Sequence, residues 1–299
     1  MTNRREFLTK AGLGAAALAA PIPWSSSALA QQMLPRRPIP GSDASLPIVG
    51  LGNARVFAEG DLDASRELIS TFRARGGAYI DCIFDLRFTA AEAVGDLSGA
   101  NDLFLGTYFM EEDETQLREN IRRILDLSGK TQLDLVHAWP EFAVPNWDLI
   151  RKLKDEGLTK YIGISRHNKS YYDAMMKVME TDTVDFVQVN YSPLEREADE
   201  RILPMAMDRG IAVNINRAFL NGDYFGMVAG HDLPEWAADF DCESWAQFTL
   251  KFSLSHPAVN CVLTETSNPR HVIDNIGAGL GAMPDAANRE RIVAHLKSL

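Results

Sequence analysis

Eight short apolar runs, separated by longer amphipathic segments, are the feature that most constrains how this 299-residue chain can fold. The runs span residues 47–53, 78–83, 102–107, 133–139, 161–165, 184–190, 211–216 and 259–264. They are too continuously apolar to leave one face in water, which indicates buried, parallel strands. Eight strand–helix units in roughly 250 residues predict an α/β fold of the (β/α)8 TIM-barrel type.

Helical periodicity is found in the segments between the runs. It is clearest over 115–127, where Leu117, Ile121 and Ile124 recur on one face and charged residues occupy the other. Weaker helical patterns lie at 63–75, 147–156, 170–179, 197–207 and 244–254, and an extra C-terminal helix is expected over 286–298. The long connection 217–241 has a length typical of a functional loop.

An open, doubly wound sheet is the alternative fold. Such a sheet usually carries a glycine-rich phosphate turn after its first strand. The segment GLGNARVFAEG, residues 50–60, does not have the GxGxxG spacing. The barrel is therefore favoured, and because no repeat or linker divides it, we expect one domain over 31–299.

Residues 1–30 have the features of a targeting segment. Arg4 and Arg5, an apolar stretch over 11–20 and a small-residue cleavage site at 28–30 follow one another in the order of a signal peptide. The apolar stretch is about half the ~20 residues that a membrane-spanning helix needs, so no stable membrane anchor is expected. The arginine pair resembles the twin-arginine export signal, which is recognised by translocation machinery. We therefore expect a protein that is exported folded to a periplasmic or other extracytoplasmic compartment.

Charge and cysteine content narrow the possible partners. The formal net charge of −11 opposes binding to nucleic acid or to an anionic membrane. Cys82, Cys242 and Cys261 are an odd number, and two of them lie in apolar runs, which indicates buried thiols rather than a disulfide framework. No CxxC motif or Cys/His cluster suggests a metal site. A small-molecule substrate is the partner that the sequence favours.

Polar residues at the ends of the predicted strands are the candidates for function. In a TIM barrel the active site lies at the C-terminal ends of the strands, so these residues should share one mouth. They are Asp81, Tyr108, His137, Trp139, Ser165, Gln188, Asn216 and Glu265. His137 and Trp139 have the same parity in a strand, so both can face the barrel interior.

Five segments, in order along the chain, resemble those of the aldo/keto reductase family. They are PIVGLGN (47–53), GGAYIDC (76–82), EGLTKYIGISRHN (156–168), VDFVQVNYSPLEREADERILPMAMDRGIAV (184–213) and TSNPRHVIDN (266–275). The resemblance covers essentially the whole chain after residue 30. It implies a (β/α)8 barrel and an oxidoreductase that acts on a carbonyl or alcohol with NAD or NADP.

The family's reaction passes a hydride to a carbonyl carbon while a tyrosine protonates the oxygen. An aspartate–lysine pair lowers the pKa of that tyrosine, and a histidine orients the carbonyl. In this sequence the aspartate is Asp81, but the tyrosine position holds Leu86, with Phe88 close by. The lysine position holds Tyr108, and the histidine position holds Trp139. The resemblance therefore implies a divergent member with a rearranged proton donor.

Two interpretations of the third and fourth strands remain open. In one, Tyr108 delivers the proton, with Asp81 beside it and His137 as the orienting or basic partner. In the other, Tyr108 and Trp139 are aromatic walls of a substrate pocket that also includes Leu86 and Phe88, and His137 is a hydrogen-bonded core residue. Without a lysine, nothing lowers the pKa of Tyr108 from about 10, and the Asp81 charge alone would raise it.

The resemblance also assigns cofactor contacts. Ser165 and Gln188 match the family's contacts to the nicotinamide amide, while the asparagine that follows the serine is Arg166. The aromatic residue that stacks under the nicotinamide falls on Asn216, and Arg217 opens a loop that would cover the pyrophosphate. Arg217 could pair with that group.

The final segment of the resemblance bears on the choice of dinucleotide. Thr266, Asp274 and Asn275 fit the adenosine end. Glu265 stands where the family carries a lysine or a small residue. A carboxylate there would repel a 2′-phosphate by about 4 kcal/mol at a separation of ~4 Å and an effective dielectric of ~20, before screening. NAD is therefore favoured over NADP.

Three functional hypotheses follow from the sequence. The first is an exported aldo/keto reductase-like oxidoreductase. The second is a catalytically inactive barrel that binds a small ligand or a partner protein. The third is a redox-neutral isomerase or lyase that uses Asp81 and His137 as acid and base.

Overall fold

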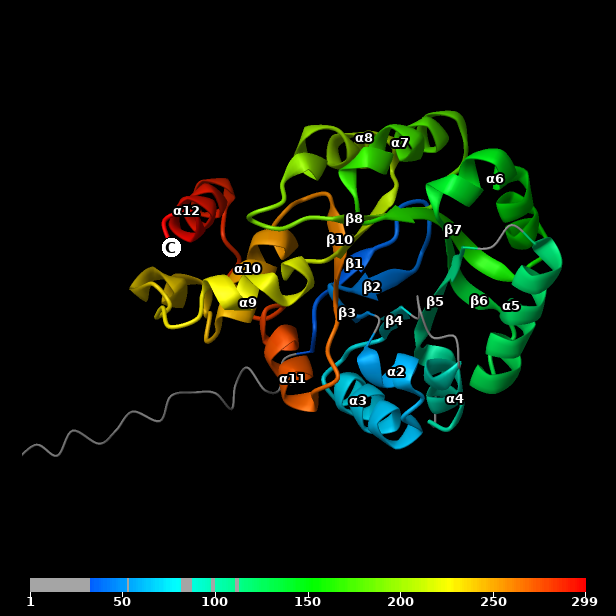
Figure 1. The fold of residues 1–299 in the computed structure, drawn as a ribbon, viewed down its shortest axis with the longest axis horizontal. Coiled ribbons are helices and arrows are strands. Elements are labelled where there is room, and N and C mark those ends of the chain that lie inside the picture. The colour runs from blue at the N-terminus through cyan, green and yellow to red at the C-terminus, as the bar shows by residue number, and fades with distance from the viewer. Residues whose placement is uncertain (1–32, 53, 82–87, 98–99, 111–112) are drawn as a thin grey trace, which may run out of the picture. The chain divides into compact units, whose positions relative to one another are not determined.

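The computed structural model describes residues 33–52, 54–81, 88–97, 100–110 and 113–299. The expected signal segment 1–30, Cys82 and Leu86 lie outside these residues. Eight parallel strands close into a barrel (Figure 1). They are β3 (Val49–Leu51), β4 (Tyr79–Asp81), β5 (Phe104–Phe109), β6 (Leu133–Ala138), β7 (Thr159–Arg166), β8 (Phe186–Asn190), β9 (Ala212–Asn216) and β10 (Val259–Thr264). The predicted TIM barrel is confirmed.

Helices surround the strands on the outside of the barrel (Figure 1). The predicted ones are α3 (Leu62–Ala74), α5 (Glu114–Ser128), α6 (Pro140–Asp155), α7 (Tyr172–Thr181), α8 (Ile202–Arg209) and α10 (Trp245–Leu254). Those not predicted are α2 (Arg55–Glu59), α4 (Thr89–Gly95), α9 (Asp223–Met227) and α11 (Pro269–Gly277). Local signals set the ends of α5: the Asp113 carboxylate accepts the Thr115 N–H, and Gly129 ends the helix in the left-handed conformation.

One predicted helix is divided in two. The segment 197–207 was expected to be continuous, but it forms the 3₁₀ turn η3 (Glu197–Glu200) followed by α8. The break falls at Arg201, whose backbone is non-helical. Pro204 explains it, because a proline ring clashes with the carbonyl four residues earlier and prevents an α-helix from running through Glu200.

A short hairpin that the sequence did not predict lies across the N-terminal end of the barrel. It consists of β1 (Arg36–Pro38) and β2 (Ser45–Pro47), paired antiparallel. From it, Ile39 and Leu46 pack into an interior cluster with Tyr79 and Phe186, which begin their strands. The Arg37 guanidinium also donates to the Leu254 carbonyl at 2.6 Å. The hairpin therefore closes this end of the barrel.

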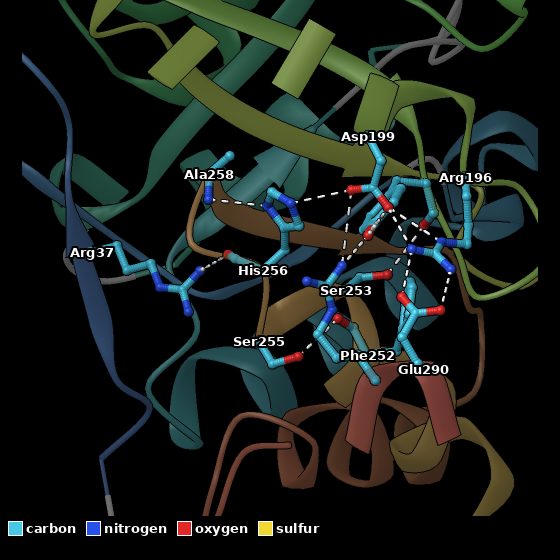
Figure 2. A network of polar contacts seen from close by, with 11 residues as sticks. Arg37, Arg196, Asp199, Phe252, Ser253, Ser255, His256, Ala258 and Glu290 are labelled. Carbon is cyan, nitrogen blue, oxygen red and sulfur yellow. Dashed lines mark hydrogen bonds and ion pairs between the residues drawn. The ribbon is translucent and has the colours of Figure 1, made fainter. Parts of the chain in front are cut away.

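The expected C-terminal helix is present as α12 (Ala286–Leu296). A polar network attaches it to the barrel (Figure 2). Arg196 donates two hydrogen bonds to Glu290 of α12, each 2.8 Å long, and it also donates to Asp199 at 3.2 Å. His256 Nε2 lies 3.1 Å from the opposite oxygen of Asp199. Residues 33–299 form a single compact unit.

The long connection after β9 has more internal structure than its sequence indicated. It contains η4 (Leu220–Gly222), α9 and η5 (Glu235–Phe240). Arg217 fastens its start, donating to Asn221 Oδ1 at 2.9 Å and to the His167 carbonyl at 3.1 Å. Within the segments that the structure describes, no helix is long and apolar enough to span a bilayer.

Candidate active site

The strand register brings the sequence-predicted polar residues together at the C-terminal end of the barrel. Asp81 is the last residue of β4 and pairs with Gly106 of β5, two residues before Tyr108. A side chain at Gly106 would place its Cβ only 3.2 Å from Asp81 Oδ1. The glycine therefore leaves the room that the Asp81 carboxyl occupies. On the opposite side of the barrel, Ser165 of β7 pairs with Gln188 of β8.

A compact hydrogen-bonded cluster is built from these residues. Tyr108 Oη lies 2.6 Å from Asp81 Oδ2 and 2.5 Å from Gln188 Oε1. Gln188 Nε2 donates to the same Asp81 oxygen at 2.9 Å. Ser165 Oγ and Asn216 Nδ2 donate to Gln188 Oε1 at 2.9 and 3.2 Å. Five residues from five different strands thus meet around one amide and one carboxyl.

Burial sets the proton affinities in this cluster. It raises the pKa of Asp81 to about 6, with a smaller rise from the nearby Glu265 charge, against the hydrogen bonds from Tyr108 and Gln188. Burial and the Asp81 charge together hold the pKa of Tyr108 well above its ordinary value. This is the direction expected from the sequence, because the described residues place no lysine against the phenol. A free phenolate is therefore strongly disfavoured.

His137 lies below the cluster and does not take part in it. Its ring packs on Gly163, where a Cβ would approach Nδ1 to 2.5 Å, and its centroid lies 5.3 Å from that of Tyr108. Neither ring nitrogen has a hydrogen-bond partner among the described residues. Burial lowers the pKa of His137 to about 3, so the ring is neutral. The expected core histidine is buried but makes no hydrogen bond with the described residues, and its expected role as an orienting or basic partner of Tyr108 stays a prediction.

Two of the residues predicted as walls of a substrate pocket, Trp139 and Phe88, lie elsewhere. Trp139 follows β6 and is the N-cap residue of α6, so its side chain no longer follows the alternation of the strand. The Arg166 guanidinium packs on two rings, with Cζ 3.9 Å from the centroid of Trp139 and 4.5 Å from that of Tyr171. Phe88 opens α4 and packs against Arg123 at 4.7 Å. Neither is among the residues that line the cavity beside Asp81.

Three adjoining cavities form a groove that starts at the cluster. The first, about 240 Å³, is lined by Asp81, Tyr108, Gln188, Asn216, Arg217 and Glu265. The second, about 240 Å³, follows the loop after β9 and shares Arg217 and Glu265 with the first. The third, about 260 Å³, shares Glu265 and Phe225 with the second and reaches Thr266, Asp274 and Asn275. Apart from Ser165, the residues predicted for the two ends of a dinucleotide therefore line adjoining cavities that share lining residues.

Sequence reasoning missed the apolar side of this groove. Phe219 and Phe225 line the second and third cavities, and their ring centroids are 5.0 Å apart. The length of the connection after β9 was the available signal for their role. Trp245 and Ser244, at the start of α10, also line the third cavity and gave no signal in the sequence.

Two carboxyl groups face the barrel mouth. Thr264 of β10 pairs with Leu51 of β3, which pairs with Ile80 of β4, so the next residues in each strand are Glu265, Gly52 and Asp81. The Glu265 side chain lies over Gly52, with Cγ 3.1 Å from where a glycine Cβ would be. Partial desolvation raises the pKa of Glu265. No cluster of three or more potential metal ligands occurs in the described part of the chain.

The fold and the groove define an α/β-barrel protein with a ligand site at the C-terminal ends of its strands. The model of the aldo/keto reductase family matches residues 110–290, more than half of the chain, and the chain belongs to this family. Membership of a reductase family supports the oxidoreductase class that the sequence favoured.

Individual relatives agree with this assignment. An aldo-keto reductase of Mycolicibacterium vanbaalenii is 26% identical over 251 residues, which cover 78% of this chain and 83% of that protein. The holo form of an aldo-keto reductase from Bacillus halodurans superposes with a TM-score of 0.68 at 18% identity, covering 88% of this chain and 96% of that one. An aldo/keto reductase from Klebsiella pneumoniae, solved with NADP and acetate, gives 0.62 at 18% identity, with 85% and 94% covered.

Proposed function

We propose that this protein interconverts a carbonyl compound and its alcohol, with a nicotinamide dinucleotide bound along the groove. The row of adjoining cavities carries the proposal. It runs from the polar cluster around Asp81 and Tyr108, past Arg217 and Glu265, to the buried Asn275. A site of this shape suits an extended ligand with polar groups at both ends.

The residues in the groove fit such a dinucleotide. Asn216 Oδ1 is buried without a hydrogen-bond partner among the described residues, beside Gln188 and Ser165, so a carboxamide N–H could satisfy it. Arg217 supplies a positive charge to the first two cavities. Glu265 lines all three cavities and favours NAD over the 2′-phosphorylated NADP. The solved Klebsiella relative supports a nicotinamide dinucleotide in general terms.

Bound in the groove, the reduced dinucleotide supplies the hydride for the carbonyl carbon. The chain supplies the proton and the orientation. Tyr108 is the hydroxyl that lines the first cavity, and Asp81 and Gln188 fix its position through bonds of 2.6 and 2.5 Å. We propose that Tyr108, on the third barrel strand, replaces the tyrosine that the family carries at the position of Leu86.

Cofactor binding and turnover should be measured separately on the purified full-length protein. We expect NADH to quench protein fluorescence, and a panel of neutral aldehydes and ketones to cause loss of NADH absorbance. Tyr108→Phe should retain binding and lose turnover by roughly 10²–10⁴-fold, the usual contribution of a general acid. Tyr171→Phe, which removes the hydroxyl of a tyrosine stacked on Arg166 outside the cavity, is the matched control. Absence of both quenching and absorbance loss would refute the proposal.

The alternative hypotheses make different predictions for the same experiment. Binding without turnover of any carbonyl would favour an inactive, ligand-binding barrel. A redox-neutral enzyme with Asp81 and His137 as acid and base is disfavoured, because the neutral His137 ring is fully buried and does not line the cavity.

We also propose that the protein is exported by the twin-arginine route. The support is the order of Arg4 and Arg5, the apolar stretch 11–20 and the small-residue site at 28–30. Fusing residues 1–30 to a folded reporter should direct it out of the cytoplasm, and a variant with both arginines changed to lysine should not. A reporter that stays in the cytoplasm with the native segment would contradict the proposal.

A further inference from the structure

We propose that Asp81, in its neutral carboxylic acid form, stores the proton that Tyr108 passes to the substrate oxygen. The protonation state stands on the geometry of the cluster alone, whereas the transfer to a substrate rests on the proposed carbonyl reduction.

The number of protons in the cluster carries the inference. Tyr108 Oη makes two short contacts, 2.6 Å to Asp81 Oδ2 and 2.5 Å to Gln188 Oε1. A phenol has one proton, and an amide oxygen has none. If Asp81 were a carboxylate, one of these contacts would bring two lone pairs together with no proton between them. A proton on Asp81 Oδ2 resolves this, because the acid then donates to Tyr108 and Tyr108 donates to Gln188.

The extra proton is needed in both orientations of the Gln188 amide, whose oxygen and nitrogen can exchange places. With the amide reversed, the nitrogen would donate to Tyr108, but the oxygen would lie 2.9 Å from Asp81 Oδ2. That contact also needs a proton, since Tyr108 has only one to give. Either orientation requires one more proton than Tyr108 and Gln188 supply, and Asp81 is the group that can carry it.

The surroundings of Asp81 favour its neutral form. Its side chain is buried, and Oδ1 has no hydrogen-bond partner among the described residues. Burial raises its pKa to about 6, and the charged group that adds to this rise is a carboxylate, Glu265. Among the described residues, the ionisable groups that interact with it, line its cavity or pack on Tyr108 are Tyr108, His137, Cys261, Glu265, His167 and Arg217. Arg217 is fastened to Asn221 and the His167 carbonyl, and its charge does not contribute to the shift at Asp81.

During reduction, the carbonyl carbon would gain one hydride, which carries the two electrons, from the reduced dinucleotide as the reductant. The carbonyl oxygen takes the proton from Tyr108 Oη, and Tyr108 Oη takes the proton from Asp81 Oδ2. Tyr108 therefore never persists as a phenolate, which burial makes unfavourable. Asp81 is left as the carboxylate, and water at the open cavity returns a proton to it.

Infrared spectroscopy of the full-length protein without cofactor tests the protonation state. Aspartate carrying ¹³C in its carboxyl group identifies aspartic acid bands in the wild-type protein. We expect a protonated-aspartate band that is present between about pH 5 and 6 and disappears as the pH rises through about 6. Ordinary aspartates have a pKa of about 3.9, so they are ionised at these pH values and give little of this band. Asp81→Asn should lack the band, and Glu265→Gln, which removes the neighbouring carboxyl, should retain it.

The pH dependence of carbonyl reduction tests the transfer. The wild-type rate should fall as the pH rises through the same value near 6, because the acid form is lost, while Asp81→Asn should be slower and lack this step. A band without turnover supports the neutral acid and refutes the proposed function. If the protein turns over while Asp81 is ionised at every pH of the infrared titration, the proposal that Asp81 stores the proton is wrong and the proposed function stands.

Discussion

Replacing Glu265 by glutamine tests the electrostatic coupling between the two carboxyl groups at the barrel mouth. Glu265 and Asp81 follow strands separated by one intervening strand, β3, so their backbones are about two strand spacings, roughly 10 Å, apart. Two charges at that distance repel by roughly 0.4 to 1.7 kcal/mol for effective dielectrics between ~80 and ~20. Because Glu265 is exposed to solvent, the lower half of that range applies.

The expected result is a small shift with a definite sign. Removing the Glu265 charge makes the Asp81 carboxylate easier to form, so the pKa of Asp81 should fall from about 6 by about 0.3 to 0.8 units. Most of the elevation should remain, since burial is its largest cause. The ¹³C-aspartate infrared titration measures the shift directly. Glu67→Gln, on the exposed face of α3, removes the same charge elsewhere and should leave the titration unchanged. A pKa that stays constant or rises in Glu265→Gln would refute the reasoning.

Three further outcomes are expected. Glu265→Lys should strengthen NADP binding relative to NAD by about 2 kcal/mol, or roughly thirtyfold, measured by fluorescence titration with each dinucleotide. Asp134→Asn should lower the free energy of unfolding, measured in urea, by about 3–5 kcal/mol. The reason is that the buried Lys130 Nζ, 2.8 Å from Asp134 Oδ2, loses its counter-charge. Replacing both residues by apolar ones should lower the free energy of unfolding by less. Burial raises the pKa of Asp199, but hydrogen bonds from His256 and other groups outweigh this and lower the pKa below its ordinary value. The resulting stabilisation is present above the unfolded-state pKa of ~3.9 and is lost as the pH falls through the folded-state value, so acid should destabilise the wild type more than Asp199→Asn.

The fold was predictable because its main signal is local. Each barrel strand coincides with an apolar run in the sequence, and burial on both faces is what makes such a run continuous. The β1–β2 hairpin lacked this signal, since its strands are three residues long and rich in proline and charge. Ile39 and Leu46 gain their role only once the strands around Tyr79 have formed a closed end to cover. That dependence on distant residues cannot be seen in a local pattern.

The candidate site was predictable in its membership and less so in its orientation. Strand-end position was enough to bring Asp81, Tyr108 and Gln188 together, because parallel strands share one C-terminal edge. The error at Trp139 arose from the assumption that strand alternation continues past Ala138. Pro140, at the first position of α6, was a usable signal that the strand had already ended. The missing hydrogen bonds of His137 had no counterpart in the sequence, since they depend on which neighbours the barrel places around it.

The proposed replacements at the mouth change the local electrostatics in one direction. Tyr108 stands at the position where the family resemblance implies a lysine, and it has no positive charge. Glu265 stands where the resemblance implies a lysine or a small residue, and it adds a negative charge. A tyrosine so placed is a poor source of a free proton, since burial and the Asp81 charge disfavour its anion. Burial, with a smaller contribution from the Glu265 charge, raises the pKa of Asp81 to about 6, where a carboxylic acid can be both held and released. We therefore propose that the absence of a lysine at the position of Tyr108 and the use of Asp81 as the acid belong together, because without that cation the buried Asp81 keeps its proton more readily.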